Sequence, residues 1–279
     1  MKQLVKTSGA VLLVGSLLFS STSALAQKNA EDRYVYIGTE IGLSEPVVKS
    51  FDYKDVAGRK TAIRLKQSQM YGGRVGYSFY PSMMAEISWT HQPKYTLAYK
   101  LPIEDLSSLV PAQAAAIFPN GLAIPSNAGK TNISANVVTL NWLYEFDKQF
   151  AEIKPYIILG AGVAQINIKP TATNWKLPAA ISAGLGGVTE VPYFKIKKNT
   201  INCFAWQIGG GFSRDIGENF SIDVGAKLQV VKDIKIKYDT LVASSFADLA
   251  KPEFKAAKPI KKTIGVGEFT IGFTFKIPV

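Results

Sequence analysis

The feature that most constrains this fold is a strict alternation between residues 204 and 231, where two stretches flank the turn Asp215–Asn219. Because successive side chains of a β-strand leave opposite faces, a period of two predicts two strands joined as a hairpin. One face of the second strand is apolar and consists of Phe220, Ile222, Val224, Ala226, Leu228 and Val230. The other face is small or polar and consists of Ser221, Asp223, Gly225, Lys227 and Gln229.

The apolar face of this hairpin needs a covering layer, and the remainder of the chain supplies neither helices nor a second apolar sheet. An apolar outer face combined with a polar, glycine-rich inner face is typical of a transmembrane β-barrel. We therefore predict that the hairpin forms one quarter of such a barrel and that lipid contacts its apolar side.

Further alternating stretches complete a prediction of eight strands. They occupy residues 33–43, 69–79, 83–95, 132–146, 153–168 and 263–277. Short turns follow the second, fourth and sixth strands, whereas long segments at 44–68, 96–131, 169–202 and 235–262 follow the others. This alternation is typical of outer-membrane barrels, which have short periplasmic turns and long outer loops. We predict an all-β, eight-stranded antiparallel up-and-down transmembrane barrel. A ten-stranded alternative arises if residues 190–199 extend the hairpin between strands five and six.

The first 26 residues have the pattern of a secretory signal peptide. Lys2 and Lys6 precede an apolar run at 10–19, and the stretch ends in the A-x-A pattern of residues 24–26. The apolar run is shorter than a spanning helix, and no later run approaches the roughly 20 apolar residues that such a helix requires. We predict a signal peptide at 1–26, a single barrel domain at 27–279, and export to the outer membrane.

Composition limits the chemistry that this chain can perform. Cys203 is the lone cysteine and His91 the lone histidine, which excludes an internal disulfide and a His/Cys metal cluster, and we predict no cofactor. The formal net charge is +11, of which the predicted signal carries +2. Because the chain is predicted to be exported, an anionic surface or glycan is a more reasonable partner than nucleic acid.

Three stretches resemble strands of the small eight-stranded outer-membrane barrels of Gram-negative bacteria. They are KPYIILGAG at 154–162, AWQIGGG at 205–211 and GEFTIG at 267–272. That resemblance covers the mature chain and indicates the OmpA-barrel and opacity-type, porin-like surface proteins, some of which are adhesins. It implies an outer-membrane location and identifies the fold more closely than the activity. Such barrels usually end on an aromatic residue, whereas this chain ends at Val279 with Phe275 as its last aromatic residue.

The predicted inner face carries charges of both signs. These residues are Glu40, Arg74, Glu86, Asp223, Lys227, Glu268 and Lys276. An eight-stranded barrel has an interior just wide enough for side chains to fill. Because buried charges are costly without partners, we predict that these residues pair into a polar plug. The alternative is a water-filled lumen, in which case the protein is a small channel or a structural barrel.

An enzymatic function would depend on His91, since some barrels of this class modify lipid A with a histidine and a serine. Ser88 is the nearest serine, but three residues along a strand place the two side chains on opposite faces. A nucleophile and its base must lie within hydrogen-bond reach. We therefore predict that the protein is not an enzyme.

The predicted outer loops are rich in lysine and arginine, and loops of a rigid scaffold commonly carry its function. The candidates for partner binding are Arg59, Lys60, Arg64, Lys195, Lys197, Lys198, Lys258, Lys261 and Lys262. We predict that these residues mediate adhesion to host extracellular proteins or anionic glycans. The alternative is that they contact outer-membrane lipid and neutralise the phosphates of lipopolysaccharide. The loop segments 104–118 and 122–124 are mostly apolar and are predicted to pack on each other as a cap or, if they are exposed, to form a protein-binding patch. Residues 240–250 have the pattern of a short amphipathic helix.

Overall fold

The computed structural model describes residues 33–47, 50–54, 60–80, 82–100, 104–105, 123–124, 128–146, 153–177, 179–242, 253–256 and 258–279. The predicted signal peptide lies outside these ranges, as does most of the apolar loop at 104–118. Within the described ranges no helix has the length and apolarity needed to cross a membrane.

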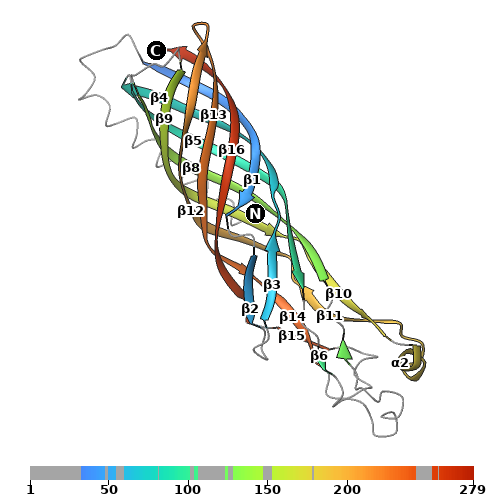
Figure 1. The fold of residues 1–279 in the computed structure, drawn as a ribbon. Coiled ribbons are helices and arrows are strands. Elements are labelled where there is room, and N and C mark those ends of the chain that lie inside the picture. Colours follow the sequence, from blue (N-terminus) through green and yellow to red (C-terminus); the bar gives the residue numbers. More distant parts are fainter. Residues whose placement is uncertain are drawn as a thin grey trace.

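Eight antiparallel strands form a closed ring (Figure 1). In chain order they are β1 (Tyr34–Pro46), β4 (Ser68–Tyr80), β5 (Met83–Lys100), β8 (Ala128–Glu145), β9 (Ile153–Ile168), β12 (Asn199–Ile216), β13 (Phe220–Ile236) and β16 (Ile260–Pro278). Each strand pairs with its sequence neighbour in the ring, β16 pairs with β1, and the ring includes the pairing of β5 with β8. The predicted fold class and all eight predicted strands are confirmed.

The strand ends that the short connections join lie together at one end of the barrel, beside the C-terminus (Figure 1). These connections are residues 81–82, 146–152 and 217–219, of which 81 and 147–152 lie outside the described ranges. Gly217 in the last turn has a φ of 77°, a left-handed conformation that glycine adopts without steric cost. We call this end the proximal end. The long segments lie at the opposite, distal end, and we call the structure that they form there the distal extension.

The outer surface of the ring carries a continuous apolar band. Large apolar side chains point away from the barrel on all eight strands, and several are more than half exposed, including Phe269 at 62%, Phe212 at 60% and Ile41 at 58%. A soluble monomer rarely exposes so large an apolar surface. A closed ring leaves no unpaired strand edge, which is the condition for spanning lipid with β-structure. The band and the ring together are the architecture of an outer-membrane β-barrel.

The long segments predicted between the barrel strands form the distal extension, and much of this extension consists of additional strands. It contains β2 (Ser50–Lys54), β3 (Lys60–Leu65), β6 (Glu104–Asp105), β7 (Ala123–Ile124), β10 (Thr171–Lys176), α2 (Ala179–Gly184), β11 (Glu190–Ile196), β14 (Tyr238–Val242) and β15 (Glu253–Ala256). The β2–β3 hairpin joins the barrel sheet through β5, and a separate sheet has the order β10-β11-β14-β15. Figure 1 shows these strands clustered at the distal end.

Two finer predictions are corrected by this sheet. Strand β14 covers residues 238–242, so the predicted helix at 240–250 is wrong at its start, and residues 243–250 lie outside the described ranges. Strand β11 pairs with β10 and β14 instead of entering the ring, so the ten-stranded alternative is also wrong.

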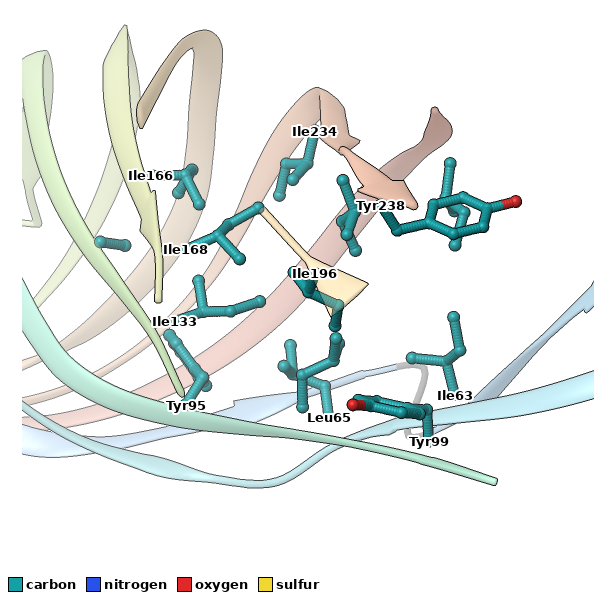
Figure 2. Close-up of a cluster of buried hydrophobic side chains, with 14 of the residues drawn as sticks. Ile63, Leu65, Tyr95, Tyr99, Ile133, Ile166, Ile168, Ile196, Ile234 and Tyr238 are labelled. Carbon is teal, nitrogen blue, oxygen red and sulfur yellow. The ribbon is translucent and has the colours of Figure 1, made fainter. Parts of the chain in front are cut away.

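The barrel interior changes character between its two halves. In the proximal half most inward side chains are polar, beside a small apolar cluster of Tyr36, Met84, Leu143 and Ile158. Towards the distal end the inward side chains form a large apolar cluster (Figure 2). The labelled members of this cluster are Ile63, Leu65, Tyr95, Tyr99, Ile133, Ile166, Ile168, Ile196, Ile234 and Tyr238. They come from the barrel strands and from β3, β11 and β14, so the extension packs onto the same core as the barrel.

The outer face of the barrel changes from apolar to polar at about the level where the interior changes from polar to apolar. On β9 the outward residues are apolar up to Val163 and then become Gln165 and Asn167, and the exposed Lys169 follows directly after the strand. The inward residues of the same strand become Ala164, Ile166 and Ile168. Outside the lipid, the outer surface meets water and the interior must supply an ordinary apolar core. The polarity inversion therefore marks the distal edge of the membrane.

Candidate functional site

The centre of the proximal lumen is a cluster around Arg74 on β4. Its guanidinium pairs with the Asp223 carboxylate, donates a hydrogen bond of 2.7 Å to the Thr274 hydroxyl, and lies 3.9 Å from the Glu86 carboxylate. Glu86 also accepts a hydrogen bond of 3.1 Å from the Tyr36 hydroxyl. One arginine thus holds carboxylates from two other strands, β5 and β13.

A second cluster lies around Lys227 on β13. The Lys227 ammonium donates to both oxygens of Glu40, at 2.9 and 3.0 Å, and lies 3.8 Å from Glu268. Glu268 accepts a hydrogen bond of 2.6 Å from Gln92. These charged side chains are almost completely buried, so each depends on its partners for the solvation that water would otherwise provide.

A chain of neutral side chains fills the adjoining space, and sequence reasoning assigned it no role. Asn141 donates to Glu86 at 2.8 Å and to Ser88 at 2.9 Å, and accepts a bond of 2.7 Å from Gln207. Ser88 in turn lies 2.8 Å from the Thr139 hydroxyl. The signal for these residues is present in the sequence, because they occupy the same alternating face as the predicted charges. Their pairing depends on the register of the sheet, in which β5 pairs with β8 and β12 lies across β9 from β8.

Lys276 is the predicted lumen residue that pairs elsewhere. Its ammonium lies 2.5 Å from Asp215, which also accepts a hydrogen bond of 2.9 Å from Lys154. Lys154 lies 3.5 Å from Glu145 as well. This group sits at the proximal mouth, close to the tight turns. A pocket is lined by members of both groups, among them Arg74 and Asp223 of the Arg74 cluster and Glu145 and Lys276 of the mouth group. Tyr34, Tyr156 and Ser213 complete part of its wall.

The other six predicted lumen residues therefore meet inside the barrel in two adjacent clusters. The large apolar cluster lies on the distal side of both. The transition between these layers is marked by Ser44 and Tyr95, whose hydroxyls are hydrogen-bonded to each other. Among the described residues, no group of three or more His, Cys, Asp or Glu side chains is arranged to hold a metal ion. The arrangement suits a packed interior more than a binding cavity.

His91 lies on the lipid-facing side of β5, in an aromatic group with Tyr71 and Trp89. Its Nδ1 is 2.6 Å from the Asn136 side-chain oxygen. Ser88 points into the lumen and is buried. The two residues are therefore on opposite sides of the barrel wall, which removes the geometry needed for a serine nucleophile activated by this histidine.

The predicted partner-binding residues lie mainly on strands of the distal extension or beside them. Arg64, Lys197, Lys198, Lys258 and Lys261 are exposed, Lys195 and Lys262 are half-buried, and Arg59 lies outside the described ranges. Lys60 begins β3. Lys197 pairs with Asp239 at 2.9 Å and Lys261 with Asp233 at 3.2 Å. Lys195 lies 3.7 Å from the centre of the Phe254 ring.

Further exposed lysines share this surface and were not among the nine candidates. They are Lys66, Lys94, Lys130, Lys169, Lys176, Lys232, Lys235, Lys237 and Lys255. Where side-chain exposure is described on the extension, the exposed acids are Asp233, Glu190 and Glu253. The distal surface is therefore strongly basic.

A sequence relative establishes the family. The uncharacterised protein RP788 of Rickettsia prowazekii strain Madrid E is 38% identical over 209 residues, which cover 75% of this chain and 99% of that protein. This chain belongs to the RP788 family. No family model matches the chain.

Solved outer-membrane proteins share the general architecture. OprG of Pseudomonas aeruginosa is 14% identical with a TM-score of 0.47, covering 89% of this chain and 97% of OprG. Neisserial surface protein A is 12% identical with a TM-score of 0.42, covering 88% and 98%. The protease OmpT of Escherichia coli is 9% identical with a TM-score of 0.41, covering 92% and 100%. The fold assignment rests on the closed ring of strand pairs.

Proposed function

We propose that this protein is a non-conducting, non-enzymatic anchor in the outer membrane that presents a basic surface for adhesion. The barrel holds the protein in the membrane after export through the predicted signal peptide at 1–26. The distal extension then faces outward and binds anionic polymers, such as acidic glycans or acidic segments of host extracellular proteins.

The observation that carries the proposal is the one-sided distribution of charge. Exposed lysines on the described part of the extension greatly outnumber exposed acids, whereas the proximal end pairs Lys154 and Lys276 with carboxylates. An unbalanced basic surface attracts anionic partners and accelerates their association. Because the extension shares a packed core with the barrel, these lysines are displayed on a rigid support.

Binding of a sulfated polymer to intact cells tests this function. Cells that produce the protein should retain heparin, and the double variant Lys198→Gln with Lys258→Gln should retain several-fold less, because two exposed cations are removed. A matched control removes the same net charge at the proximal turns, through Ser82→Asp with Asn219→Asp. Equal retention by the wild type and by cells that lack the protein would refute adhesion to such polymers.

A small channel is the second candidate, and the pocket between Arg74 and Lys276 is the observation that favours it. The charged clusters and the apolar cluster fill the lumen on the distal side of the pocket, so we infer that the pocket is closed at that end. In planar lipid bilayers we therefore expect the purified protein to give no steady single-channel current. Large and stable currents would instead show that ions and water pass the charged clusters and the apolar cluster. That result would contradict the non-conducting anchor and support a channel.

A further inference from the structure

The distal edge of the apolar band carries a lysine whose ammonium lies near a lipid-facing aromatic ring. Phe204 on β12 points outward and is 52% exposed, and the Lys232 ammonium of β13 lies 5.9 Å from the centre of its ring. Lys232 is itself exposed. A cation at this point lies where acyl chains end and lipid headgroups begin.

An irregularity in β13 exposes Lys232 together with its neighbour. The pairing of β13 with β16 shifts between Val231 and Ile234. Asp233 has a φ of 61°, an uncommon conformation for a residue other than glycine. Bulges of this kind redirect side chains at the edges of barrels and near functional sites. Here both residues of the bulge, Lys232 and Asp233, are exposed.

A pair of like charges follows immediately beyond the bulge. Lys235 on β13 lies directly opposite Lys261 on β16, and both side chains are exposed. Like charges in this position destabilise a sheet. Asp233 pairs with Lys261 at 3.2 Å and neutralises one of the three lysines. Lys232, Lys235 and Lys261 with Asp233 therefore form a group with a net positive charge.

We propose that this group, the band-edge lysine cluster, binds the anionic phosphate of an outer-leaflet lipid. The phosphate lies among Lys232, Lys235 and Lys261, and the acyl chains descend along the exposed apolar surface of Phe204, Ile208 and Leu228. This inference rests on the membrane placement in the proposed function but not on adhesion.

The position of the cluster favours a lipid over a soluble glycan. A sulfated glycan in solution would use the cations but would gain nothing from Phe204 and the apolar surface beneath it. A phosphorylated lipid satisfies both the cations and the apolar contact. Lysines close to an anionic lipid surface strengthen binding through their charge.

Lipid selectivity of the purified full-length mature protein, folded in neutral detergent, tests the proposal. The protein is mixed with equal amounts of bis-phosphorylated lipid A and the same lipid A without phosphates, and the retained species are counted by native mass spectrometry. We expect the wild type to prefer the phosphorylated form and Lys232→Gln with Lys235→Gln to lose that preference by about tenfold. The matched variant Lys176→Gln with Lys255→Gln removes the same charge from β10 and β15 and should keep the preference.

Two additions make the result decisive. Heat-shifted mobility on denaturing gels verifies that each variant is folded, and Lys232→Arg with Lys235→Arg should retain the preference because the charge is kept. An unchanged preference in the glutamine variant, or no preference in the wild type, would overturn the proposal. Displacement of lipid A by a heparin fragment through these same lysines would assign the cluster to glycans. Adhesion can fail in the heparin experiment on cells while this lipid preference persists, so the two proposals are tested separately.

Discussion

At the scale of single residues, the lumen shows how an eight-stranded barrel accommodates charge. Arg74 meets Asp223 and Glu86, and Lys227 meets Glu40 and Glu268, so that each buried cation has two carboxylates nearby. Buried pairs recover little net free energy over apolar packing, but a charge left without its partner is strongly destabilising. Each network therefore depends on all its members.

Replacing Asp223 by alanine should reduce the free energy of unfolding by about 3 kcal/mol, because the buried Arg74 loses its nearest carboxylate. Asp215→Ala is a matched control, since Asp215 also pairs with cations, Lys276 and Lys154, but its side chain is 36% exposed. We expect this second change to cost at most about 1 kcal/mol. Urea titration in lipid vesicles, followed by tryptophan fluorescence, measures both. Equal losses would show that burial does not govern these pairs.

At the scale of strands, the polarity inversion decides where lipid ends. The alternation changes phase where two apolar residues are adjacent, as at Val137–Val138 on β8, Val163–Ala164 on β9 and Val230–Val231 on β13. On the proximal side of these points the outer face is apolar, and on the distal side the inner face is apolar. The strands remain continuous through the change because hydrogen bonding between neighbours does not depend on which face is apolar.

Lysine substitutions on the outer face of β9, one on each side of the polarity inversion, should locate the edge of the membrane. Leu159→Lys puts a charge within the lipid band and should destabilise the folded barrel by about 2–4 kcal/mol or prevent assembly. Gln165→Lys lies on the same face of the same strand, beyond the inversion, and should have little effect. The measurement is the folded fraction in vesicles as urea is increased. A similar loss for both variants would place the membrane edge elsewhere.

At the scale of the whole molecule, the two ends of the barrel have different chemistry. The proximal end has short turns and paired charges, and the distal end has a basic surface over an apolar core. The proposed function requires the distal end to face outward. Cys203 is buried and is the lone cysteine, so an introduced cysteine can be labelled selectively.

Labelling of intact cells with a membrane-impermeant maleimide tests this orientation. Lys198→Cys at the distal end should react in intact cells, whereas Glu218→Cys in the tight turn before β13 should react only after the outer membrane is permeabilised. Both positions are exposed in the structure, so the difference depends on the side of the membrane. The wild type, with Cys203 alone, is the unlabelled control. Labelling of Glu218→Cys in intact cells would reverse the proposed orientation.

The eight strands, their order along the chain and the inward position of residues such as Glu40 and Asp223 could all be predicted from the residues alone. These properties follow from the period of two, because alternation is a local consequence of strand geometry. The same pattern indicated the short turns, since residues 217–219 interrupt an otherwise regular alternation.

The pairing of the inward charges and the strands formed within the long segments could not be predicted from the alternation and depend on the folded barrel. Lys276 shares the inner face with Arg74 yet pairs with Asp215, because strand register and closure determine which side chains share a level. Strands β10, β11, β14 and β15 have short and weak sequence patterns, and they are stabilised by pairing with each other and by the common apolar core. Contacts between residues far apart in the chain arise from closure of the ring, and local periodicity carries no information about them.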